Sequence, residues 1–563
     1  MKTDIEAILF DVGGTLRYTA RGSRAEKKKI LAQIMEMAGA QEPAPEFSRR
    51  LVTRARHYKR WAEKTHIELS ESDLWSQWML PDLPESIIRE RAIPLNQLYR
   101  AWLGQRLPFP ESREVIIELF RRGYRLGVVS NTTSSVEVPE LLRELQISGC
   151  FETVVLSAVS GTRKPSPAIL LEAARRMGVS PEKCAYVGDR VDRDAAAARA
   201  AGFTMAVIVE PGKGNGQELV VHEAPTQSLI PDYICGSLRD LLNVFLPRPA
   251  PQPETVYDVS LSTMYAIRNF PGLSDFIEFA RRAGFAHIEL NHKVTSAMLE
   301  GIPLERSSIR SVHEPCPADI GEAELKEHDW LISSTDELCR VEGVRAIRRS
   351  IDLASLVGAK AIIIHAGEVL RDVRKLERQL RKMIDAGEQG SQEYGFIKEE
   401  MIALRKQAAA AGFESVKKSL VELLEYAAPH GICLGLENRY HYLEYPSPDE
   451  IEVLLGMAGP DEIGFIYDAG HAYTLDALGF TPHTEWLERF SARIIGTHLH
   501  DLRNTTDHFA PGLGTIDFRQ IAAYLPKNAF RTCEIQTFNS PEQVKASLKL
   551  LAEQGCIQNI SFR

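Results

Sequence analysis

The chain has 563 residues, of which 44% are hydrophobic and 25% charged, an ordinary balance for a globular protein but a long chain for one hydrophobic core. Its formal net charge of −9 argues against a protein built to grip nucleic acid. No apolar run approaches the roughly 20 residues of a membrane span, no signal peptide is read, and the eight cysteines form no CxxC pair. We therefore expect a cytoplasmic protein with two α/β domains.

Three predicted strands in the first half of the chain, at 7–10, 125–130 and 184–188, end on polar residues. The polar residues at these ends, and at a turn between the second and third strands, are Asp11, Ser130, Asn131, Lys164, Asp189 and Asp194. Ligand sites of open α/β sheets form at the carboxyl ends of parallel strands. The pattern therefore predicts one polar site at this edge of the sheet.

This ordered set of residues resembles the haloacid dehalogenase-like (HAD) hydrolases over residues 1 to about 245, which implies a Rossmann-like α/β domain. The resemblance implies that Asp11 is a nucleophile forming an aspartyl-phosphate, and that Lys164 neutralises charge in the transition state. It makes Ser130 and Asn131 phosphoryl-binding residues. It also implies a Mg²⁺ site, whose ligands would be Asp11, the backbone of Gly13, Asp189 and Asp194.

Gly13 departs from the family pattern, because phosphatases of this kind usually carry an aspartate there as general acid and base. General acid–base assistance is typically worth about 10²–10⁴-fold in rate. The first half is therefore predicted to be either a phosphatase or a catalytically weak binding module. The helix-rich segment at about 17–107 corresponds to the helical cap of the resemblance, which closes over small substrates.

A proline-rich stretch from Leu246 to Glu254 separates the two halves, with proline at every second position from Pro247 to Pro253. Each proline fixes φ and removes a backbone donor, so neither a helix nor a central strand runs through the stretch. The sequence therefore predicts domains at 1–245 and 255–563, joined by a semi-rigid linker at 246–254.

The second half alternates strand-like runs with amphipathic helices. Eight strands are predicted, at 257–261, 287–290, 309–313, 361–365, 432–437, 463–468, 494–500 and 532–535. Eight strand–helix units in about 300 residues predict a (β/α)₈ TIM barrel. A charged helical insertion from Glu368 to about Gly412 is predicted to form a lid or partner surface.

Four residues close successive strands of this predicted barrel: Glu437, Asp468, His498 and Glu534. Their spacings of 31, 30 and 36 residues are about one strand–helix unit each. Neighbouring strand ends point such side chains into one pocket, and carboxylates with an imidazole suit Mn²⁺, Mg²⁺, Co²⁺ or Zn²⁺. We predict a divalent-metal site at the barrel mouth.

The pattern resembles the xylose-isomerase-like TIM barrels over residues 255 to about 560, a superfamily of sugar isomerases, ketose 3-epimerases and endonuclease IV. In the epimerase branch the matching residues bind one metal. Glu437 and Glu534 would also exchange a proton on carbon through an enediolate. The resemblance implies that His471 contacts the substrate, and Arg503 is a further candidate.

A rival interpretation rests on extra histidines, because His313, His365, His471 and His508 resemble the additional zinc ligands of the endonuclease IV branch. That branch hydrolyses phosphodiesters with three zinc ions. Its Asp-x-His segment is here Asp507-His508, with no intervening residue, and no basic stripe is visible.

The sequence as a whole predicts a bifunctional enzyme. A HAD-type phosphatase acting on a small phosphorylated metabolite would be joined to a sugar or sugar phosphate isomerase or epimerase. A multinuclear zinc phosphoesterase, or aldol or dehydratase chemistry, remains an alternative for the barrel. The identity of the sugar and the oligomeric state are left open.

Overall fold

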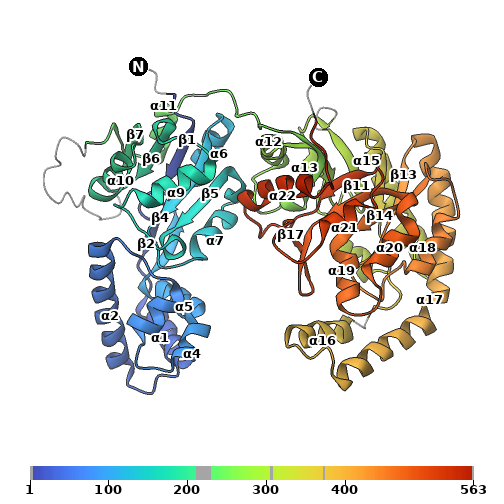
Figure 1. Cartoon of the computed structure of the whole chain (residues 1–563), viewed down its shortest axis with the longest axis horizontal. Helices are drawn as coiled ribbons and strands as arrows, with labels where there is room; N and C mark the ends of the chain where they lie inside the picture. The colour runs from blue at the N-terminus through green and yellow to red at the C-terminus, as the bar shows by residue number, and fades with distance from the viewer. Residues whose placement is uncertain (1–3, 211–229, 305–307, 372–373, 561–563) are drawn as a thin grey trace. The chain divides into compact units, whose positions relative to one another are not determined.

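The structure is a computed structural model that describes residues 4–210, 230–304, 308–371 and 374–560. The chain divides into two compact units, Met1–Pro251 and Gln252–Arg563. The predicted α/β fold class is confirmed in both units: the first carries an open parallel sheet and the second a closed barrel (Figure 1). Among the described residues, no helix combines the length and apolarity needed to cross a membrane.

The first unit is built on a six-stranded sheet in the order β5-β4-β1-β6-β7-β8. Its strands are β1 (Ala7–Phe10), β4 (Arg125–Ser130), β5 (Phe151–Leu156), β6 (Cys184–Gly188), β7 (Met205–Val209) and β8 (Tyr233–Cys235). β1 is central and pairs in parallel with β4 and β6, and all four of its residues are buried. A continuous apolar run is typical of such a doubly covered strand.

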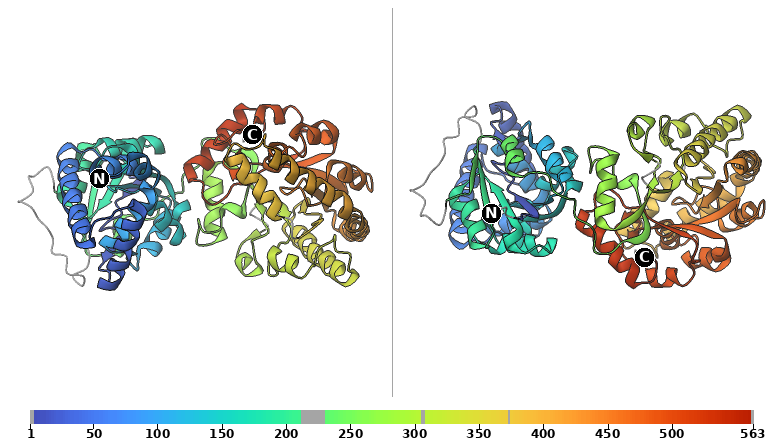
Figure 2. Two further views of the ribbon diagram at one scale, coloured as in Figure 1. Left: turned by 90° about the horizontal axis from the view of Figure 1, so that it is seen from below. Right: turned by 90° about the horizontal axis from the view of Figure 1, so that it is seen from above.

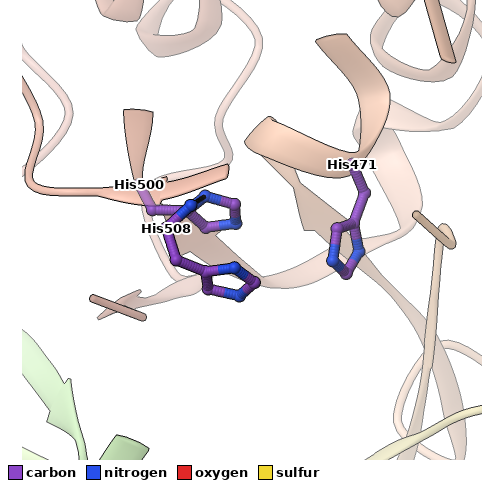
Figure 3. A group of neighbouring side chains, drawn as sticks. All are labelled: His471, His500 and His508. Atoms are coloured by element: carbon purple, nitrogen blue, oxygen red, sulfur yellow. Dashed lines mark hydrogen bonds between the residues drawn. The ribbon is translucent and has the colours of Figure 1, made fainter. Parts of the chain in front are cut away.

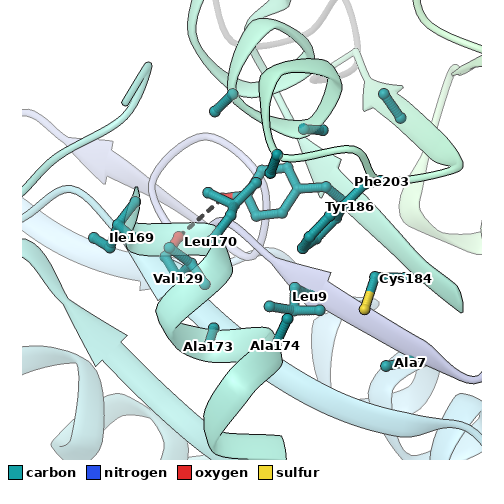
Figure 4. Close-up of a cluster of buried hydrophobic side chains, with 14 of the residues drawn as sticks. Ala7, Leu9, Val129, Ile169, Leu170, Ala173, Ala174, Cys184, Tyr186 and Phe203 are labelled. Carbon is teal, nitrogen blue, oxygen red and sulfur yellow. Dashed lines mark hydrogen bonds between the residues drawn. The ribbon is translucent and has the colours of Figure 1, made fainter. Parts of the chain in front are cut away.

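Helix α9 (Ala168–Met177) covers one face of this sheet. Its apolar side packs with Leu9 and Cys184 of the strands, and the hydroxyl of Tyr186 donates to the carbonyl of Val129 at 2.9 Å (Figure 4). This core fixes β1, β4 and β6 side by side, so their carboxyl ends meet at one edge.

The helical cap is inserted between the short antiparallel strands β2 (Arg17–Ala20) and β3 (Gln105–Pro108). It contains α1 (Arg24–Ala38), α2 (Ala44–Thr65), the π-helix η1 (Leu74–Met79) and α5 (Ala92–Leu103). Side chains from these helices form a hydrophobic core separate from that of the sheet. Since both ends of the cap pass through β2 and β3, the cap is attached beside the carboxyl end of β1.

The first prolines of the linker lie on the first unit. The N–H of Arg248 donates to the carbonyl of Arg122 at 2.9 Å, and the hydroxyl of Tyr124 donates to the carbonyl of Leu246 at 2.8 Å. Gly123 has φ of 89°, and a Cβ there would lie 2.5 Å from the carbonyl oxygen of Arg248. Glycine is therefore required where the linker crosses.

The second unit is a closed eight-stranded parallel barrel with helices around it (Figures 1 and 2). Its strands are β9 (Tyr257–Ser262), β10 (Phe285–Leu290), β11 (Ile309–His313), β12 (Ala361–Ile364), β13 (Cys433–Glu437), β14 (Ile463–Asp468), β15 (Ile494–Leu499) and β18 (Phe530–Cys533). All eight predicted strands are present, and their bounds differ from the predicted ones by at most two residues.

Two departures from simple strand–helix alternation shape the barrel mouth. After β15, the hairpin strands β16 (Asp501–Arg503) and β17 (Thr506–Phe509) replace a direct connection to a helix. After β12, the predicted charged insertion forms α16 (Arg374–Asp385) and the 36-residue α17 (Gln392–Ala427).

Candidate active sites

The first candidate site lies at the carboxyl ends of β1 and β6. Asp11 follows β1, Asp189 follows β6, and Asp194 lies in the π-helical turn η4 (Val191–Ala195). Carboxylate oxygens of all three residues lie within 4.8 Å of one another. The backbone of Gly14 lies so close that a Cβ there would be 2.0 Å from Asp189 Oδ2. Such a cluster of oxygen ligands fits the Mg²⁺ that the sequence predicts.

Lys164 joins this cluster from the neighbouring loop. Its buried Nζ lies 2.8 Å from Asp11 Oδ1 and 2.9 Å from Asp194 Oδ1. Asn131 holds the lysine's backbone in two directions: its Nδ2 donates to the Lys164 carbonyl, and its Oδ1 accepts from the Lys164 N–H, each at 2.9 Å. Ser130 is buried at the end of β4. The structure thus brings all the residues predicted for this site to one edge of the sheet.

Arg193 is a member of the cluster that sequence reasoning missed. One guanidinium nitrogen lies 2.7 Å from Asp11 Oδ2, 2.7 Å from Asp189 Oδ1 and 2.8 Å from Asp194 Oδ2. The chain therefore places its own cation among the three predicted metal ligands. A divalent ion that bound these oxygens would have to displace the guanidinium.

The surroundings of Asp189 and Asp194 shift the pKa values of these two carboxyl groups in opposite directions. Burial, with Asp11 nearby, raises the pKa of Asp189 to about 7. Burial also acts to raise the pKa of Asp194, but Lys164 and Arg193 together hold that pKa well below its usual value. Asp194 is therefore the acid of the two that stays ionised at neutral pH.

A cavity of about 240 Å³ lies between the cap and the sheet edge of this unit. It is lined by residues of both parts, including Tyr58, Glu68, Arg100, Asn131, Thr132 and Arg163. The buried carboxylate of Glu68 lies 3.2 Å from the Arg163 guanidinium, and burial raises the pKa of Glu68. The cap segment beside it bridges to the core, since the N–H of Glu68 donates to the Gly161 carbonyl at 3.0 Å. Because Asn131 follows Ser130, this cavity opens next to the predicted phosphoryl-binding residues.

The second candidate site lies at the mouth of the barrel. Glu437, Asp468 and His498 lie at the ends of β13, β14 and β15, and Glu534 follows β18. His498 Nδ1 lies 2.6 Å from Glu437 Oε1, 3.2 Å from Glu534 Oε2 and 3.5 Å from Asp468 Oδ2. All four side chains are buried, and their ligand atoms lie within 4.8 Å of one another.

Three carboxylates and one imidazole with these distances fit a divalent cation. Burial acts to raise the pKa of Glu437, but His498 and His365 hold it well below its usual value. Burial likewise acts to raise the pKa of Glu534, but His498 and His508 hold it well below its usual value. Both glutamates are therefore ionised and available as ligands or as proton acceptors.

The additional histidines form a second layer around these four ligands. His365 Nε2 lies 3.1 Å and His313 Nε2 lies 4.0 Å from Glu437 Oε2. In a second group, His471, His500 and His508 bring ring nitrogens within 4.8 Å of one another (Figure 3). The rings of His500 and His508 are stacked with their centroids 4.2 Å apart.

The hydrogen bonds of these rings decide which nitrogens are free for a ligand. His500 uses both nitrogens: Nε2 lies 3.0 Å from Asp468 Oδ1, and Nδ1 accepts the N–H of His508 at 2.9 Å. His471 Nδ1 bonds the Asn438 carbonyl at 3.0 Å, which leaves Nε2 facing Asp507 Oδ2 at 3.8 Å. His508 Nδ1 lies 2.9 Å from Asp507 Oδ1, and its Nε2 lies 3.6 Å from the ligand Glu534 Oε2. His500 therefore holds Asp468 in place, whereas Nε2 of His471 and of His508 is the nitrogen that a ligand could use.

Two arginines lie at the mouth. Arg503, a predicted substrate-binding residue, is exposed, and its guanidinium stacks on the ring of Phe509 at 4.7 Å, so its contact with a substrate stays a prediction. Arg439, which was not predicted, is buried and donates to Glu437 Oε2 at 2.7 Å. The Glu-Asn-Arg sequence at the end of β13 was a signal that could have identified Arg439.

Helix α16 of the insertion contacts two loops of the mouth. The buried Glu377 accepts from His441 Nδ1 at 2.8 Å and from the N–H of Tyr442 at 3.1 Å. Arg381 donates to the carbonyl of Thr505 at 2.9 Å. One loop follows Glu437 and the other precedes Asp507 and His508, so α16 ties the two together.

Comparisons with known proteins match each unit separately. The haloacid dehalogenase-like hydrolase family matches residues 5–202, and the xylose isomerase-like TIM barrel family matches residues 277–554. The glyceraldehyde 3-phosphate phosphatase of Methanopyrus kandleri is 30% identical over 241 residues, which cover 43% of this chain and 97% of that protein. The phosphoglycolate phosphatase of Nitrosococcus oceani is 35% identical over 136 residues, covering 24% and 56%.

Among solved structures, a D-tagatose 3-epimerase-like protein is 19% identical, covers 53% of this chain and 96% of its own, and has a TM-score of 0.38. A 2-haloacid dehalogenase from Pseudomonas syringae is 24% identical, covers 43% and 97%, and has a TM-score of 0.32.

Proposed function

Because this chain belongs to the haloacid dehalogenase-like hydrolases and carries a xylose isomerase-like TIM barrel, we propose that it is a bifunctional enzyme. The first unit is a phosphatase acting on a small phosphorylated metabolite. The barrel is a divalent-metal-dependent isomerase or epimerase of a sugar or sugar phosphate. The observation that carries the barrel assignment is the buried set of Glu437, Asp468, His498 and Glu534, with two ionised glutamates on one cation site.

In the first unit, Asp11 attacks phosphorus and takes the phosphoryl group as an aspartyl-phosphate, while the ester P–O bond breaks and the leaving alkoxide takes a proton from water. A second water then hydrolyses the aspartyl-phosphate, which frees Asp11 and inorganic phosphate. Lys164 lies 2.8 Å from Asp11 and neutralises the charge that develops on the phosphoryl oxygens, to which Ser130 donates. Mg²⁺, held by Asp11, Asp189, Asp194 and the backbone of Gly13, would supply further positive charge when bound. Gly13 itself provides no acid, so we expect a slower phosphatase than one with an aspartate at that position.

In the barrel, one of the two ionised glutamates, Glu437 or Glu534, removes a proton from a substrate carbon and is itself protonated in that step, so that it can return the proton to carbon. Arg439 orients Glu437 by its hydrogen bond to Oε2, and His471 binds a substrate hydroxyl through Nε2. A bound Mn²⁺, Mg²⁺, Co²⁺ or Zn²⁺ would polarise the substrate carbonyl.

Exchange of a substrate C–H proton with solvent tests the barrel assignment directly. We would incubate the chain with Mn²⁺ and a panel of ketoses and ketose phosphates in D₂O and follow deuterium incorporation by NMR. Glu437→Gln should abolish the exchange while phosphate release by the first unit continues. If no member of the panel exchanges a carbon-bound proton, the isomerase assignment fails.

A zinc phosphoesterase is the second candidate for the barrel. It is favoured by His313 and His365 beside Glu437 and by the separate group that contains His471 and His508, which could hold two further ions. Metal analysis separates the candidates, since about three zinc ions per barrel would support the phosphoesterase and one metal the isomerase.

For the first unit the second candidate is a binding module. It is favoured by the glycine at position 13 and by the guanidinium of Arg193 among the predicted metal ligands. Asp11→Asn distinguishes the two, because it abolishes phosphate release only if Asp11 is the nucleophile. We also propose that the enzyme works in a reducing compartment such as the cytoplasm, since its eight cysteines are free thiols.

A further inference from the structure

Strand β10 reaches the barrel mouth between β9 and β11, and none of its described residues is among the four predicted metal ligands. The strand and the residue that follows it nevertheless send two buried polar side chains into the site. Glu289 of β10 and Asn291, directly after its end at Leu290, are both 0% exposed, and the alternation of side chains along the strand and its extension places them on the same inward face. Neither was predicted from the sequence as a site residue.

Glu289 contacts the far side of the ligand His498. Its Oε2 lies 3.2 Å from His498 Nε2 and also accepts from the hydroxyls of Ser311 at 2.8 Å and Thr532 at 3.3 Å. His498 Nδ1 faces the carboxylates of Glu437, Asp468 and Glu534, so without a cation both ring nitrogens lie beside groups that accept a proton. A cation held by these ligands would take the lone pair of Nδ1 in place of its proton, and the ring would keep the proton on Nε2, which donates to Glu289.

Asn291 contacts a second ligand. Its Nδ2 donates to Glu534 Oε1 at 3.1 Å, which leaves Oε2 of Glu534 toward His498 at 3.2 Å. The backbone of Asn291 is fixed in turn, because its N–H donates to the hydroxyl of Thr263 at 2.7 Å. The amide therefore selects which carboxylate oxygen faces the cation site.

The other two ligands have outer partners of the same kind. Arg439 donates to Glu437 at 2.7 Å, and His500 contacts Asp468 at 3.0 Å. Each of the four ligands is thus held by one side chain that is not itself a predicted ligand. Outer partners of this kind orient metal ligands, and losing one typically costs about 10–100-fold in metal affinity.

A structural role alone explains Glu289 poorly. A fully buried carboxylate is costly unless it is well paired, and Oε1 of Glu289 has no hydrogen-bond partner among the described residues. An apolar residue at this inward position would avoid that cost. The contact with His498 is the feature that requires a carboxylate here.

We propose that β10 is the orienting strand of the metal site: Glu289 is a positioning residue that fixes the tautomer of His498, and Asn291 positions Glu534. The proposal rests on the metal site of the proposed function. It assigns to β10 no contact with the substrate.

Binding of Co²⁺ to the full chain tests this role without relying on activity. All variants would carry Asp189→Asn, so that the carboxylate cluster of the first unit contributes little. Calorimetry gives the Kd, and the visible absorption of bound Co²⁺ reports the ligand geometry. We expect Glu289→Leu to weaken Co²⁺ binding by about 10–100-fold and to change the absorption bands. Glu289→Gln keeps an acceptor oxygen and should restore most of the affinity, and Asn291→Ala should produce an intermediate loss.

Glu300→Gln is the matched control, because Glu300 is an exposed glutamate on the connection that follows β10. Far-ultraviolet circular dichroism checks the fold of each variant, and Glu289→Gln carries the test if Glu289→Leu does not fold. Unchanged affinity and spectrum in a folded Glu289→Leu variant, or loss in Glu289→Gln as large as in a folded Glu289→Leu, would overturn the proposal. A chain with intact Glu289 that binds no Co²⁺ at the barrel would instead overturn the metal site itself, and this inference with it.

Discussion

Replacing Arg193 by alanine should tighten metal binding at the carboxylate cluster of the first unit. The guanidinium makes three ion pairs at 2.7–2.8 Å, and its side chain is 21% exposed. A hydrogen bond to a charged group contributes about 1.5–3 kcal/mol net. Partial exposure screens these pairs, so we take the competition as about 1.4–2.8 kcal/mol in all, which corresponds to 10–100-fold in Kd.

The assay is calorimetric titration with Mn²⁺ of a chain that also carries Asp468→Asn, so that the barrel contributes little heat. Arg190→Ala is the control, because that arginine lies on the same turn and pairs with the exposed Asp192 instead of the cluster. Affinity in Arg193→Ala equal to or weaker than in Arg190→Ala would refute the reasoning, and would mean that Arg193 and the metal do not compete for the same oxygens.

Three further predictions follow from single contacts. Lys164→Met should lower the rate of phosphate release by about 10²–10³-fold, because it removes the buried cation beside Asp11 and Asp194. A rate within a few-fold of that of the unaltered chain would contradict the role of Lys164. Burial raises the pKa of Glu314 from 4.5 to about 7, so the folded chain binds more protons between these values and loses stability as pH rises through them. Glu314→Gln should therefore unfold like the unaltered chain at pH 4 but be about 1–3 kcal/mol more stable at pH 8 in urea titrations, and an equal difference at both pH values would count against this. Glu377→Ala should speed amide hydrogen exchange in residues 438–445, because the loop loses its bonds to α16. Barrel turnover should fall about tenfold, and phosphate release by the first unit should stay the same. An exchange rate equal to that of the unaltered chain would show that α16 does not hold this loop.

The strand ends of both units could be predicted from the sequence because the residues that mark them are neighbours in the chain. An apolar run followed by a carboxylate, as at Asp11 or Asp468, combines the signal for a buried strand with the signal for a site. The closed barrel followed from eight such runs at regular spacing. Regularity of this kind survives small errors in the bounds of each strand.

The residues that hold the ligands could not be predicted in the same way. Glu289 meets His498 across the barrel from a point 209 residues away, and Arg193 reaches the carboxylates only because a π-helical turn aims it inward. No sequence spacing encodes either contact. His500 was within reach, because it alternates with His498 on β15 and its immediate extension, and strand periodicity places the two on one face.

The hydrogen bonds of Leu246 and Arg248, in the first part of the linker, also bear on how such a fused gene could be divided. Residues up to Pro251 belong to the first unit, and the carbonyl of Arg248 covers Gly123 where no side chain fits. A break in the chain before Leu246 would remove the acceptor of the Tyr124 hydroxyl and the donor to the Arg122 carbonyl, whereas a break after Pro251 would leave both hydrogen bonds intact. Ancestral joining, or later loss of the barrel, would therefore be tolerated at the second of these points and selected against at the first.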